Sequence, residues 1–291
     1  ERSYAIYWMS GRRDRAGRRD RQSDEGKKMR IRRLGWAGIE VESGGETVVV
    51  DHVLGWKSIE PYIGPPRTPL LEPESAGRSL AAFVTHLHTD HTDAAAVSQT
   101  LAEGGSLHRP AVMEGEPLET GGVMAAELEL KEAAVDQVLM DEWESVEVGP
   151  FVATAVPAVD GFGDPQISWV IEADGKRIIH AGDTLFHGSW WLIQMRFGPF
   201  DAAFLPVNGA ITSFPHRQPA SGLEASLSPE QAVAAARILG AKRLVPIHYD
   251  GIDEPPVYQQ TDDIISRLQN TLDGEESPEL VVMAEGETLD L

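Results

Sequence analysis

The sequence THLHTDHTD at residues 85–93 decides both the fold and the chemistry of this chain. Its first residue, Thr85, ends the mainly apolar run at residues 80–85, which we expect to form a buried strand. His86 would then lie at the end of that strand. Because alternate side chains of an extended chain share a face, His86 and His88 can bind one ion together. Where the chain turns, Asp90 and His91 point elsewhere and can bind an adjacent ion. Imidazole and carboxylate groups suffice for divalent metals, so this stretch predicts a metal site.

The composition restricts which ligands such a site can use. The 291 residues include no cysteine, which excludes disulfides, thiolate metal sites and cysteine nucleophiles. The remaining ligands are His, Asp and Glu, which suit zinc, manganese or iron. The absence of cysteine also fits a reducing cytoplasm, the expected location. A hydrophobic fraction of 42% is ordinary for a globular protein, and no apolar run approaches the roughly 18 residues of a membrane span.

The charge is unevenly distributed along the chain, whose net charge is −21. Residues 1–28 hold nine Lys or Arg and five Asp or Glu, whereas residues 29–291 hold 16 and 41. Residues 10–28 have almost no apolar content, so we expect residues 1–28 to be a disordered basic extension and residues 29–291 to form a single domain. The acidic domain argues against nucleic acid as a partner. We expect a small-molecule substrate and no membrane partner, and a homo-oligomer is compatible with the sequence.

The pattern of apolar residues predicts two sheets sandwiched between helices. Residues 53–77 are rich in Pro and Gly and should form a long loop, commonly a lid or a substrate wall. The Ala-Asp-Gly sequence between residues 167–172 and 176–179 predicts a hairpin. Residues 106–150 are ambiguous. Further strands are expected at residues 29–34, 38–41, 47–50, 137–140, 145–148, 151–156, 202–206, 243–246 and 279–283. Helices are expected at residues 94–102 after Asp93, after Ser228 up to Gly240, and at 262–271.

The histidine-rich stretch resembles the HxHxDH signature of the metallo-β-lactamase superfamily. The resemblance extends over most of residues 29–291 and includes Asp51, the turn Gly182-Asp183-Thr184 and His248, each after a strand-like run. It implies an α/β fold, a four-layer αβ/βα sandwich of two mixed β-sheets flanked by helices. Residues 204–209, 227–232 and 246–249 look most like the branch that contains L-ascorbate-6-phosphate lactonase.

The resemblance also implies roles for individual residues. His86 and His88 would bind the first metal, and Asp90 and His91 the second; Asp183 would bridge both ions. His248 would complete the second site. The family usually has a third histidine in the first site, on the loop after the central strand. In this chain Asp160 stands there, so we expect it to ligate as a carboxylate, unless it only bonds its own loop backbone beside Gly161.

Four other residues are candidates for supporting the ligands or touching the substrate. Asp51 typically supports the histidine-rich loop in the family. His180 could orient a ligand, and His187 could replace the missing third ligand or contact the substrate. Asn208 could bind substrate or only make a turn before Gly209. For the two histidines a purely structural role is equally open. Phe186, Trp190 and Trp191 could wall the pocket, although paired tryptophans are more often core, and His108 and His216 are expected at the surface.

Together these features predict a metal-dependent hydrolase of the lactonase, esterase or phosphodiesterase type. One or two divalent ions, with zinc expected and manganese or iron(II) as alternatives, would lower the pKa of bound water from 15.7 to about 7. The resulting hydroxide would attack an ester, lactone or phosphoester, with Asp90 or Asp183 holding the proton. One alternative is an iron-dependent oxidoreductase of the dioxygenase type on the same fold. Another is a non-catalytic metal-binding protein, which the departure at Asp160 keeps open.

Overall fold

Strand β4 (Ser79–Phe83), which precedes the histidine-rich stretch, lies inside a seven-stranded sheet in the computed structural model. The structure describes residues 28–274 and 277–291. The expectation of disorder for residues 1–28 therefore falls, except for Lys28, outside the described residues. The strand order of this first sheet is β16-β1-β2-β3-β4-β5-β6. Its other strands are β1 (Arg30–Gly35), β2 (Gly38–Ser43), β3 (Glu46–Val50), β5 (Leu101–Arg109), β6 (Gln137–Leu139) and β16 (Thr288–Asp290).

A second seven-stranded sheet packs on the first, with the strand order β15-β13-β11-β10-β9-β8-β7. Strands β7 to β10 pair antiparallel, whereas β10, β11, β13 and β15 run parallel, so the sheet is mixed. A two-stranded sheet joins β12 (Ile211–Thr212) to β14 (Tyr258–Gln259). The strands of the second sheet are β7 (Ser145–Val148), β8 (Phe151–Pro157), β9 (Ile167–Ala173), β10 (Lys176–His180), β11 (Ala202–Pro206), β13 (Arg243–Ile247) and β15 (Glu279–Leu280).

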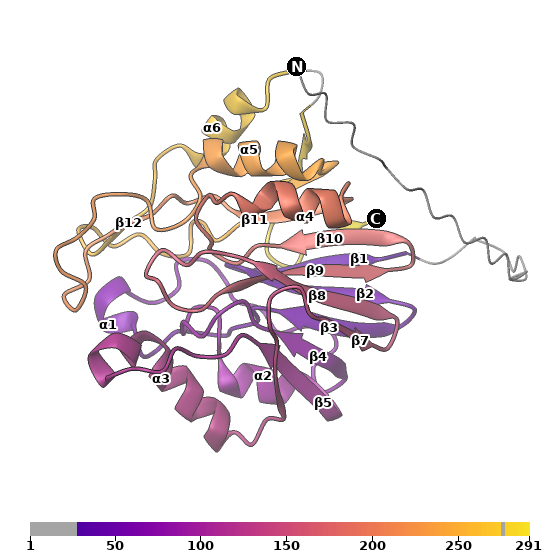
Figure 1. The fold of residues 1–291 in the computed structure, drawn as a ribbon, viewed down its shortest axis with the longest axis horizontal. Helices are drawn as coiled ribbons and strands as arrows, with labels where there is room; N and C mark the ends of the chain where they lie inside the picture. Colours follow the sequence, from indigo (N-terminus) through magenta and orange to yellow (C-terminus); the bar gives the residue numbers. More distant parts are fainter. Residues whose placement is uncertain (1–27, 275–276) are drawn as a thin grey trace, which may run out of the picture.

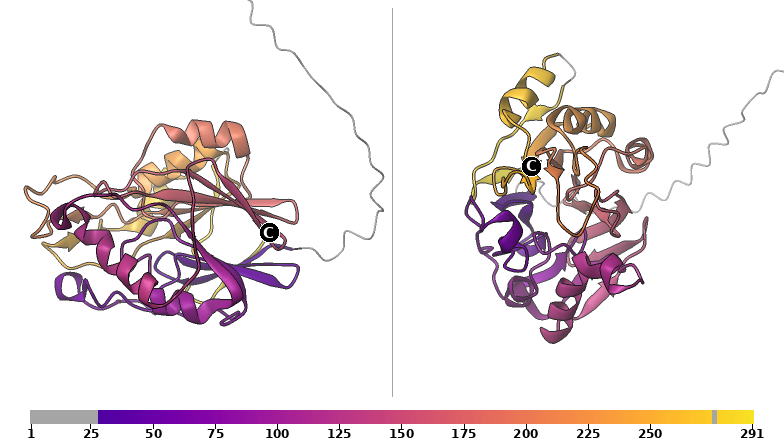
Figure 2. Two further views of the ribbon diagram at one scale, coloured as in Figure 1. Left: turned by 60° about the horizontal axis from the view of Figure 1, so that its bottom comes forward. Right: turned by 90° about the vertical axis from the view of Figure 1, so that its left-hand side faces the viewer.

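Helices cover the outer face of each sheet, which gives four layers (Figures 1 and 2). Three apolar clusters lie between these layers: one between the sheets, including Phe83 and Trp169, and one beneath each helical layer. Because both faces of the central strands are covered, β11 is apolar and buried throughout. The helices are α1 (Glu60–Ile63), α2 (Ala94–Thr100), α3 (Pro117–Glu132), α4 (Ser189–Phe197), α5 (Pro229–Leu239) and α6 (Ile264–Thr271). The architecture is the metallo-β-lactamase fold that the sequence predicts.

Local sequence explains where several elements begin and turn. The side chain of Asp93 accepts a hydrogen bond from the Ala96 amide at 3.0 Å, so α2 begins at the expected cap. Ser228 and Gln231 form a capping box at the start of α5, which ends at Gly240 in the left-handed region, with φ of 63°. Positive φ at both Asp174 and Gly175 makes the predicted hairpin turn between β9 and β10.

The structure corrects the sequence expectations in three stretches. The helix expected at residues 94–102 ends at Thr100, and the chain continues at Leu101 directly into β5. The ambiguous residues 106–150 contain the long helix α3, which packs against α2. Helix α4 was not predicted, because Trp191, Leu192 and Met195 leave its exposed face as apolar as its buried face. None of the helices in the described part of the chain is long and apolar enough to cross a membrane.

Among the expectations for aromatic and histidine side chains, the pocket wall and the surface position of His108 are wrong, whereas a core position is confirmed for Trp190. Trp190 is buried beneath α4 and Trp191 is half exposed on it, and neither they nor Phe186 lines the cavity beside the histidine-rich loop. Successive residues of a helix point in different directions, which separates the two tryptophans. His108 lies in β5 and is buried rather than exposed, because its ring packs 5.2 Å from Phe83.

Candidate metal centre

One group of side chains with convergent ligand atoms consists of His86, His88, Asp160 and Asp183, here called the first group. One ligand atom from each lies within 4.8 Å of those of the others. His86 Nε2 is 3.7 Å from Asp183 Oδ1, and His88 Nδ1 is 3.7 Å from Asp160 Oδ1. His86, Asp160 and Asp183 are buried and His88 is nearly so. The arrangement offers two imidazole nitrogens and two carboxylate oxygens, a common donor set for a divalent cation.

Asp90, His91 and His248 form a second group with the same spacing limit, here called the second group. Asp90 Oδ2 lies 3.6 Å from His91 Nε2 and 3.6 Å from His248 Nε2. Asp183 Oδ2 is 4.0 Å from His248 Nε2, while the other oxygen of that carboxylate faces His86. Asp183 therefore stands between the two groups, and the bridging role that the sequence resemblance implies stays a prediction.

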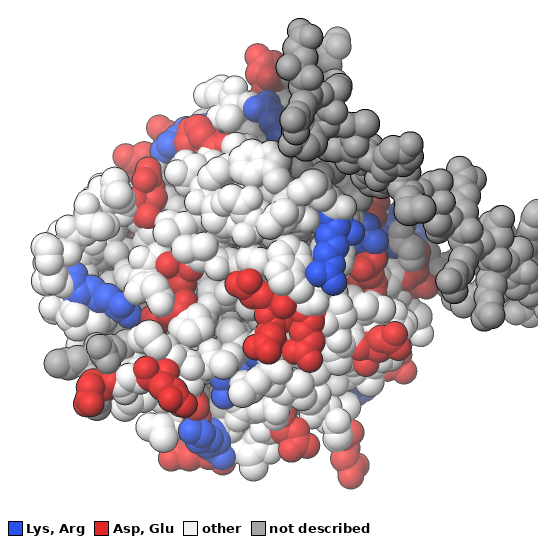
Figure 3. Space-filling model, viewed as in Figure 1, with Lys and Arg blue, Asp and Glu red and all other residues white. Residues whose placement is uncertain are grey.

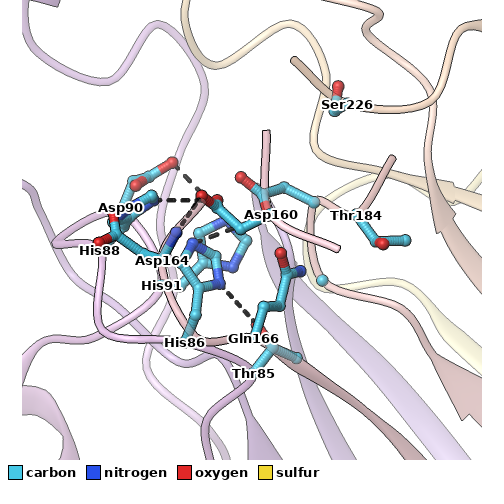
Figure 4. A network of polar contacts seen from close by, with 12 residues as sticks. Thr85, His86, His88, Asp90, His91, Asp160, Asp164, Gln166, Thr184 and Ser226 are labelled. Carbon is cyan, nitrogen blue, oxygen red and sulfur yellow. Dashed lines mark hydrogen bonds and ion pairs between the residues drawn. The ribbon is translucent and has the colours of Figure 1, made fainter. Parts of the chain in front are cut away.

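The two groups meet because several strands end at the same edge of the sandwich. His86, His88, Asp90 and His91 follow β4, and His248 follows β13. Asp183 follows β10 through a tight turn at Gly182, whose φ is +66°. A Cβ atom there would lie 2.7 Å from the side chains of Thr85 and Gln166. Figure 4 shows the side chains of the histidine-rich loop, among them His86 and His88, turned toward Asp160.

Unpaired buried atoms indicate that the two groups fit cations. Among the described residues, these side-chain atoms are buried without a hydrogen-bond partner: His86 Nε2, His91 Nε2, His248 Nε2, Asp160 Oδ1 and Asp183 Oδ1. Leaving a buried polar atom unpaired costs about 1–3 kcal/mol, more for a charged group. Several such atoms converging on one place, with lone pairs available, are satisfied together by bound metal ions. The donor set thus fits the metal that the sequence predicts.

The second group is supported by buried side chains of the first sheet. Asp51 Oδ2 lies 2.8 Å from His91 Nδ1, and the same carboxylate accepts hydrogen bonds from the amide and hydroxyl of Thr85. Trp36 Nε1 donates to Asp90 Oδ2 at 3.1 Å, and the Trp36 ring packs 4.0 Å from that of His248. These contacts fix the orientation of the rings and leave His91 Nε2 free to face the ligand cluster. Asp51 has the supporting place expected from the sequence, whereas Trp36 was missed.

The first group is supported by a loop. His88 Nε2 lies 2.8 Å from Asp164 Oδ2, and the Arg217 guanidinium donates to the same oxygen at 2.9 Å. Asp160 Oδ2 accepts hydrogen bonds from the amides of Phe162 and Asp164, so this carboxylate does bond its own loop. Its other oxygen, Oδ1, faces His88. Bonding to the loop therefore occupies one oxygen and leaves the other available as a metal ligand. Sequence reasoning missed Asp164 and Arg217.

The close packing of acids and imidazoles changes the protonation of the metal-free groups. Burial lowers the pKa of His88 and His91, but nearby carboxylates outweigh it and raise the pKa of each ring to about 9. The principal carboxylate is Asp160 for His88 and Asp90 for His91. Burial and the charge of Asp160 raise the pKa of Asp183 to about 7. Without a metal, protons therefore supply the positive charge that holds these carboxylates together.

Three candidates from the sequence lie outside both groups. His180 Nε2 donates to the Ala37 carbonyl at 2.7 Å, and its Nδ1 is 3.9 Å from Asp51 Oδ2, so it lies behind the ligands. His187 stacks on Trp190 with 4.3 Å between ring centroids, accepts a hydrogen bond from the Ser189 amide at the start of α4 and belongs to neither group. Asn208 is buried and bonds to the hydroxyls of Tyr258 and Ser226.

A cavity of about 420 Å³ opens beside the two groups and is reached by His88, Asp90, Asp183 and His248. The segment at residues 53–77, expected as a loop throughout, contains α1 and contributes Ile59, Tyr62 and Ile63 to the cavity wall, while its role as a substrate wall stays a prediction. His216 is exposed, as the sequence predicts, and lines the mouth of the same cavity. The remaining lining residues are Ser58, Thr89, Gly121, Ala125, Phe162, Ala210, Phe214, Arg217, Ala225, Ser226, Ile252 and Tyr258.

Comparisons with known proteins agree with this geometry. A family model described as a beta-lactamase superfamily domain matches residues 46–249, which include every member of both groups. A UPF0173 metal-dependent hydrolase from Thermococcus kodakarensis is 26% identical over 270 residues, covering 90% of this chain and 100% of that protein. A UPF0173 metal-dependent hydrolase from Methanoculleus marisnigri is also 26% identical, over 89% of this chain and 96% of that protein.

Solved structures share the fold at low sequence identity. Igni18, a metallo hydrolase from Ignicoccus hospitalis, superposes with a TM-score of 0.61 at 19% identity and covers 91% of this chain and 98% of its own. CmlA, a diiron β-hydroxylase from Streptomyces venezuelae, gives a TM-score of 0.67 at 16% identity, over 92% of this chain and 55% of that one. The fold is thus shared by hydrolytic and oxidative metal proteins, and the chemistry has to be argued from the site.

Proposed function

The chain belongs to the metallo-β-lactamase superfamily, and from this premise we propose that it is a metal-dependent hydrolase acting on a small molecule. One observation carries the proposal. Five buried ligand atoms without hydrogen-bond partners, from four separate segments of the chain, converge beside a cavity. The similarity to metal-dependent hydrolases over nine-tenths of the chain supports the same reading. Buried polar atoms are normally hydrogen-bonded, so this many unpaired atoms lower the stability of the metal-free fold. A bound cation would satisfy them together.

The proposed ligands follow from the two groups. His86, His88 and Asp160 would bind one ion, and Asp90, His91 and His248 would bind the other. The two oxygens of Asp183 face different groups, which supports a bridging role. Zinc is the proposed metal, with manganese and iron(II) as alternatives, because a carboxylate in place of a third histidine makes the first group richer in oxygen.

When bound, divalent ions would lower the pKa of coordinated water to about 7, which would make a hydroxide nucleophile available at neutral pH. The chain positions the reaction and handles its proton. Asp90 and Asp183 line the cavity beside the ligand groups and can hold the proton lost by water. The water oxygen bonds to the acyl carbon or phosphorus, the bond to the leaving oxygen breaks, and that oxygen takes the proton. An ester or phosphoester gives an acid and an alcohol, and a lactone gives one hydroxy acid.

The finer proposals concern the substrate and the partners. An ester, lactone or phosphoester is proposed, with the L-ascorbate-6-phosphate lactonase-like branch as the nearest analogy. Acidic side chains are spread over the face shown in Figure 3, and the net charge of −21 opposes binding of a phosphate backbone. We therefore propose no nucleic-acid and no membrane partner. A cytoplasmic location is proposed because the chain has no cysteine. A homo-oligomer is compatible with the sequence, and measurement of the molar mass in solution tests it.

The test loads chelator-treated protein with zinc, manganese or iron(II) and measures metal content beside activity. The activity panel contains lactones, carboxylic esters and phosphoesters, with oxygen uptake recorded in parallel. Hydrolysis that requires metal and consumes no oxygen is the expected result. Oxygen consumption with iron alone would instead favour the dioxygenase alternative. Tight metal binding without turnover of any panel member would favour the non-catalytic alternative.

A further inference from the structure

The cavity beside the metal groups has mostly apolar walls. Ile59 and Ile63 come from α1 and the residue before it, Phe214 lies just after β12, and Phe162 and Ile252 lie on other loops. A volume of about 420 Å³ is at the lower end of the range for small-ligand pockets, about 300–1,000 Å³. The body of a bound molecule must therefore be compact, and most of its contacts would be with hydrocarbon surface.

The walls offer little to a negatively charged substrate. Apart from histidines, the described lining residues contain a single basic side chain, Arg217. Its guanidinium donates to the Phe162 carbonyl at 2.7 Å and to Asp164 Oδ2 at 2.9 Å, so its charge is already paired. An anionic tail placed against these walls would lose its hydration without gaining a free cation, which is costly. The walls favour a neutral substrate body.

One polar group in the apolar wall has a proton that no acceptor within the described residues takes up. Tyr258 is buried in β14, and its hydroxyl oxygen accepts a hydrogen bond from Asn208 Nδ2 at 2.7 Å. Asn208 Oδ1 in turn accepts from Ser226 Oγ at 2.5 Å, which fixes the orientation of the amide. Because its oxygen is the acceptor in this chain of hydrogen bonds, Tyr258 keeps its own O–H for another partner. Tyr258 lines the same cavity as Asp183 and His248.

We propose that this cavity selects a neutral carbonyl substrate, a carboxylic ester or lactone with an apolar body, and that the Tyr258 hydroxyl donates a hydrogen bond to its carbonyl oxygen. The inference rests on the proposed hydrolase function and narrows its substrate. When water adds to the carbonyl carbon, negative charge gathers on the carbonyl oxygen, and a donor there stabilises the transition state. The ester C–O bond then breaks, and the departing alkoxide takes the proton from the water.

The role of Tyr258 is tested by Tyr258→Phe in the zinc-loaded protein with 4-nitrophenyl butyrate. Removal of one oxyanion donor typically lowers kcat by about 10²–10³-fold, so we expect about a 10²-fold loss. KM and zinc content should stay unchanged. Tyr249→Phe is the matched control, because Tyr249 is also buried but its hydroxyl accepts a hydrogen bond from Arg33 and it does not line the cavity, and this variant should retain full kcat. An unchanged kcat in Tyr258→Phe, or a change in KM alone, would overturn the role.

Substrate charge is tested with two esters of equal acyl length, 4-nitrophenyl butyrate and mono-4-nitrophenyl succinate, with metal-stripped protein as the background. We expect kcat/KM to favour butyrate at least tenfold. Calorimetric titration with N-phenylbutanamide and N-phenylsuccinamate provides a binding readout that needs no turnover, and the neutral amide should bind at least tenfold more tightly. Equal values for the neutral and charged members of both pairs would overturn the inference.

The same experiment separates this inference from the proposed function. Hydrolysis of bis(4-nitrophenyl) phosphate without hydrolysis of either carboxylic ester would overturn the carbonyl assignment and leave the hydrolase function intact. Absence of all metal-dependent hydrolysis, together with selective binding of the neutral amide, would contradict the hydrolase function and support the selectivity of the cavity.

Discussion

The two metal groups are neighbours, but they are held by different parts of the molecule. The second group is supported by Asp51 and Trp36, both buried residues at or beside strands of the first sheet. The first group depends on Asp160 and Asp164, which lie on the loop between β8 and β9, and on Arg217 from another loop. The Arg217 side chain is 31% exposed, whereas that of Asp51 is fully buried.

Because their supports differ, the two groups should lose different amounts of metal affinity when a supporting residue is substituted. A support buried in a sheet is held in place by the packing around it, because well-packed interiors resist displacement. A support on loops depends on a few hydrogen bonds and on the order of the loop itself. We therefore expect the second group to hold its metal more firmly and the first group to be the adjustable one.

The largest expected effect comes from removing residues that serve the ligand clusters directly. Asp183→Ala and His88→Ala should abolish hydrolysis of 4-nitrophenyl butyrate and remove metal while the chain still folds. Asp183→Ala should affect both groups, because its two oxygens face different groups. Elemental analysis, circular dichroism and rate measurements check this. Asp201→Ala is the matched control, since that aspartate pairs with Lys242 away from both groups. Full activity after loss of metal would refute the mechanism.

A smaller effect should follow when the support of the second group is removed. Asp51→Asn keeps the shape of the side chain but removes the charge beside His91 Nδ1. Loss of such a supporting partner typically costs 10- to 100-fold in metal affinity. Zinc competition with a chromophoric chelator should show this loss in one class of site only. Equal weakening of both classes would contradict the separate support of the two groups.

The support of the first group should give a still smaller effect. Arg217→Ala removes the cation that pairs with Asp164, one step further from His88. We expect about a tenfold loss of zinc affinity in the first group, the lower limit for supporting residues. Arg67→Ala is the matched control, because Arg67 also lies on a loop and pairs with two acidic residues outside the site. The chelator assay described above measures the zinc affinity of both variants. An equal loss of affinity in Arg217→Ala and Arg67→Ala would contradict a specific role for Arg217.

The smallest effect is a change of preference rather than a loss. Asp160→His should preserve metal binding and shift the preference of the first group toward zinc over manganese severalfold, because imidazole suits zinc better than manganese. Parallel titrations of both proteins with the two metals measure the shift. Identical preferences in the two proteins would count against Asp160 as a ligand.

Sequence reasoning reached the residues whose role is visible in local pattern. His86, Asp183 and His248 each follow a strand, and the strand-like runs before them are apolar enough to be recognised. It did not reach Asp164 or Trp36, because their partners lie 76 and 54 residues away and nothing in their own neighbourhood marks them. Only the folded chain brings such pairs together.

The elements that were missed also have physical reasons. Helix α3 contains Gly121 and Gly122 and has no clear apolar stripe, so neither propensity nor periodicity identifies it. The boundary between α2 and β5 was misplaced because Leu101 and Ala102 fit a helix as well as a strand. Their assignment is decided by pairing with β4, a contact that local sequence does not encode.

The shared carboxylate of Asp183 has a thermodynamic consequence. An ion on one side of it changes the electric field and the geometry met by an ion on the other. Such an influence is necessarily mutual: if occupancy of one position alters affinity at its neighbour by some factor, the reverse alteration has the same size. With ions in both groups, as proposed, metal uptake would be a property of the pair, and constants measured on variants that retain a single position would not add up to the native isotherm.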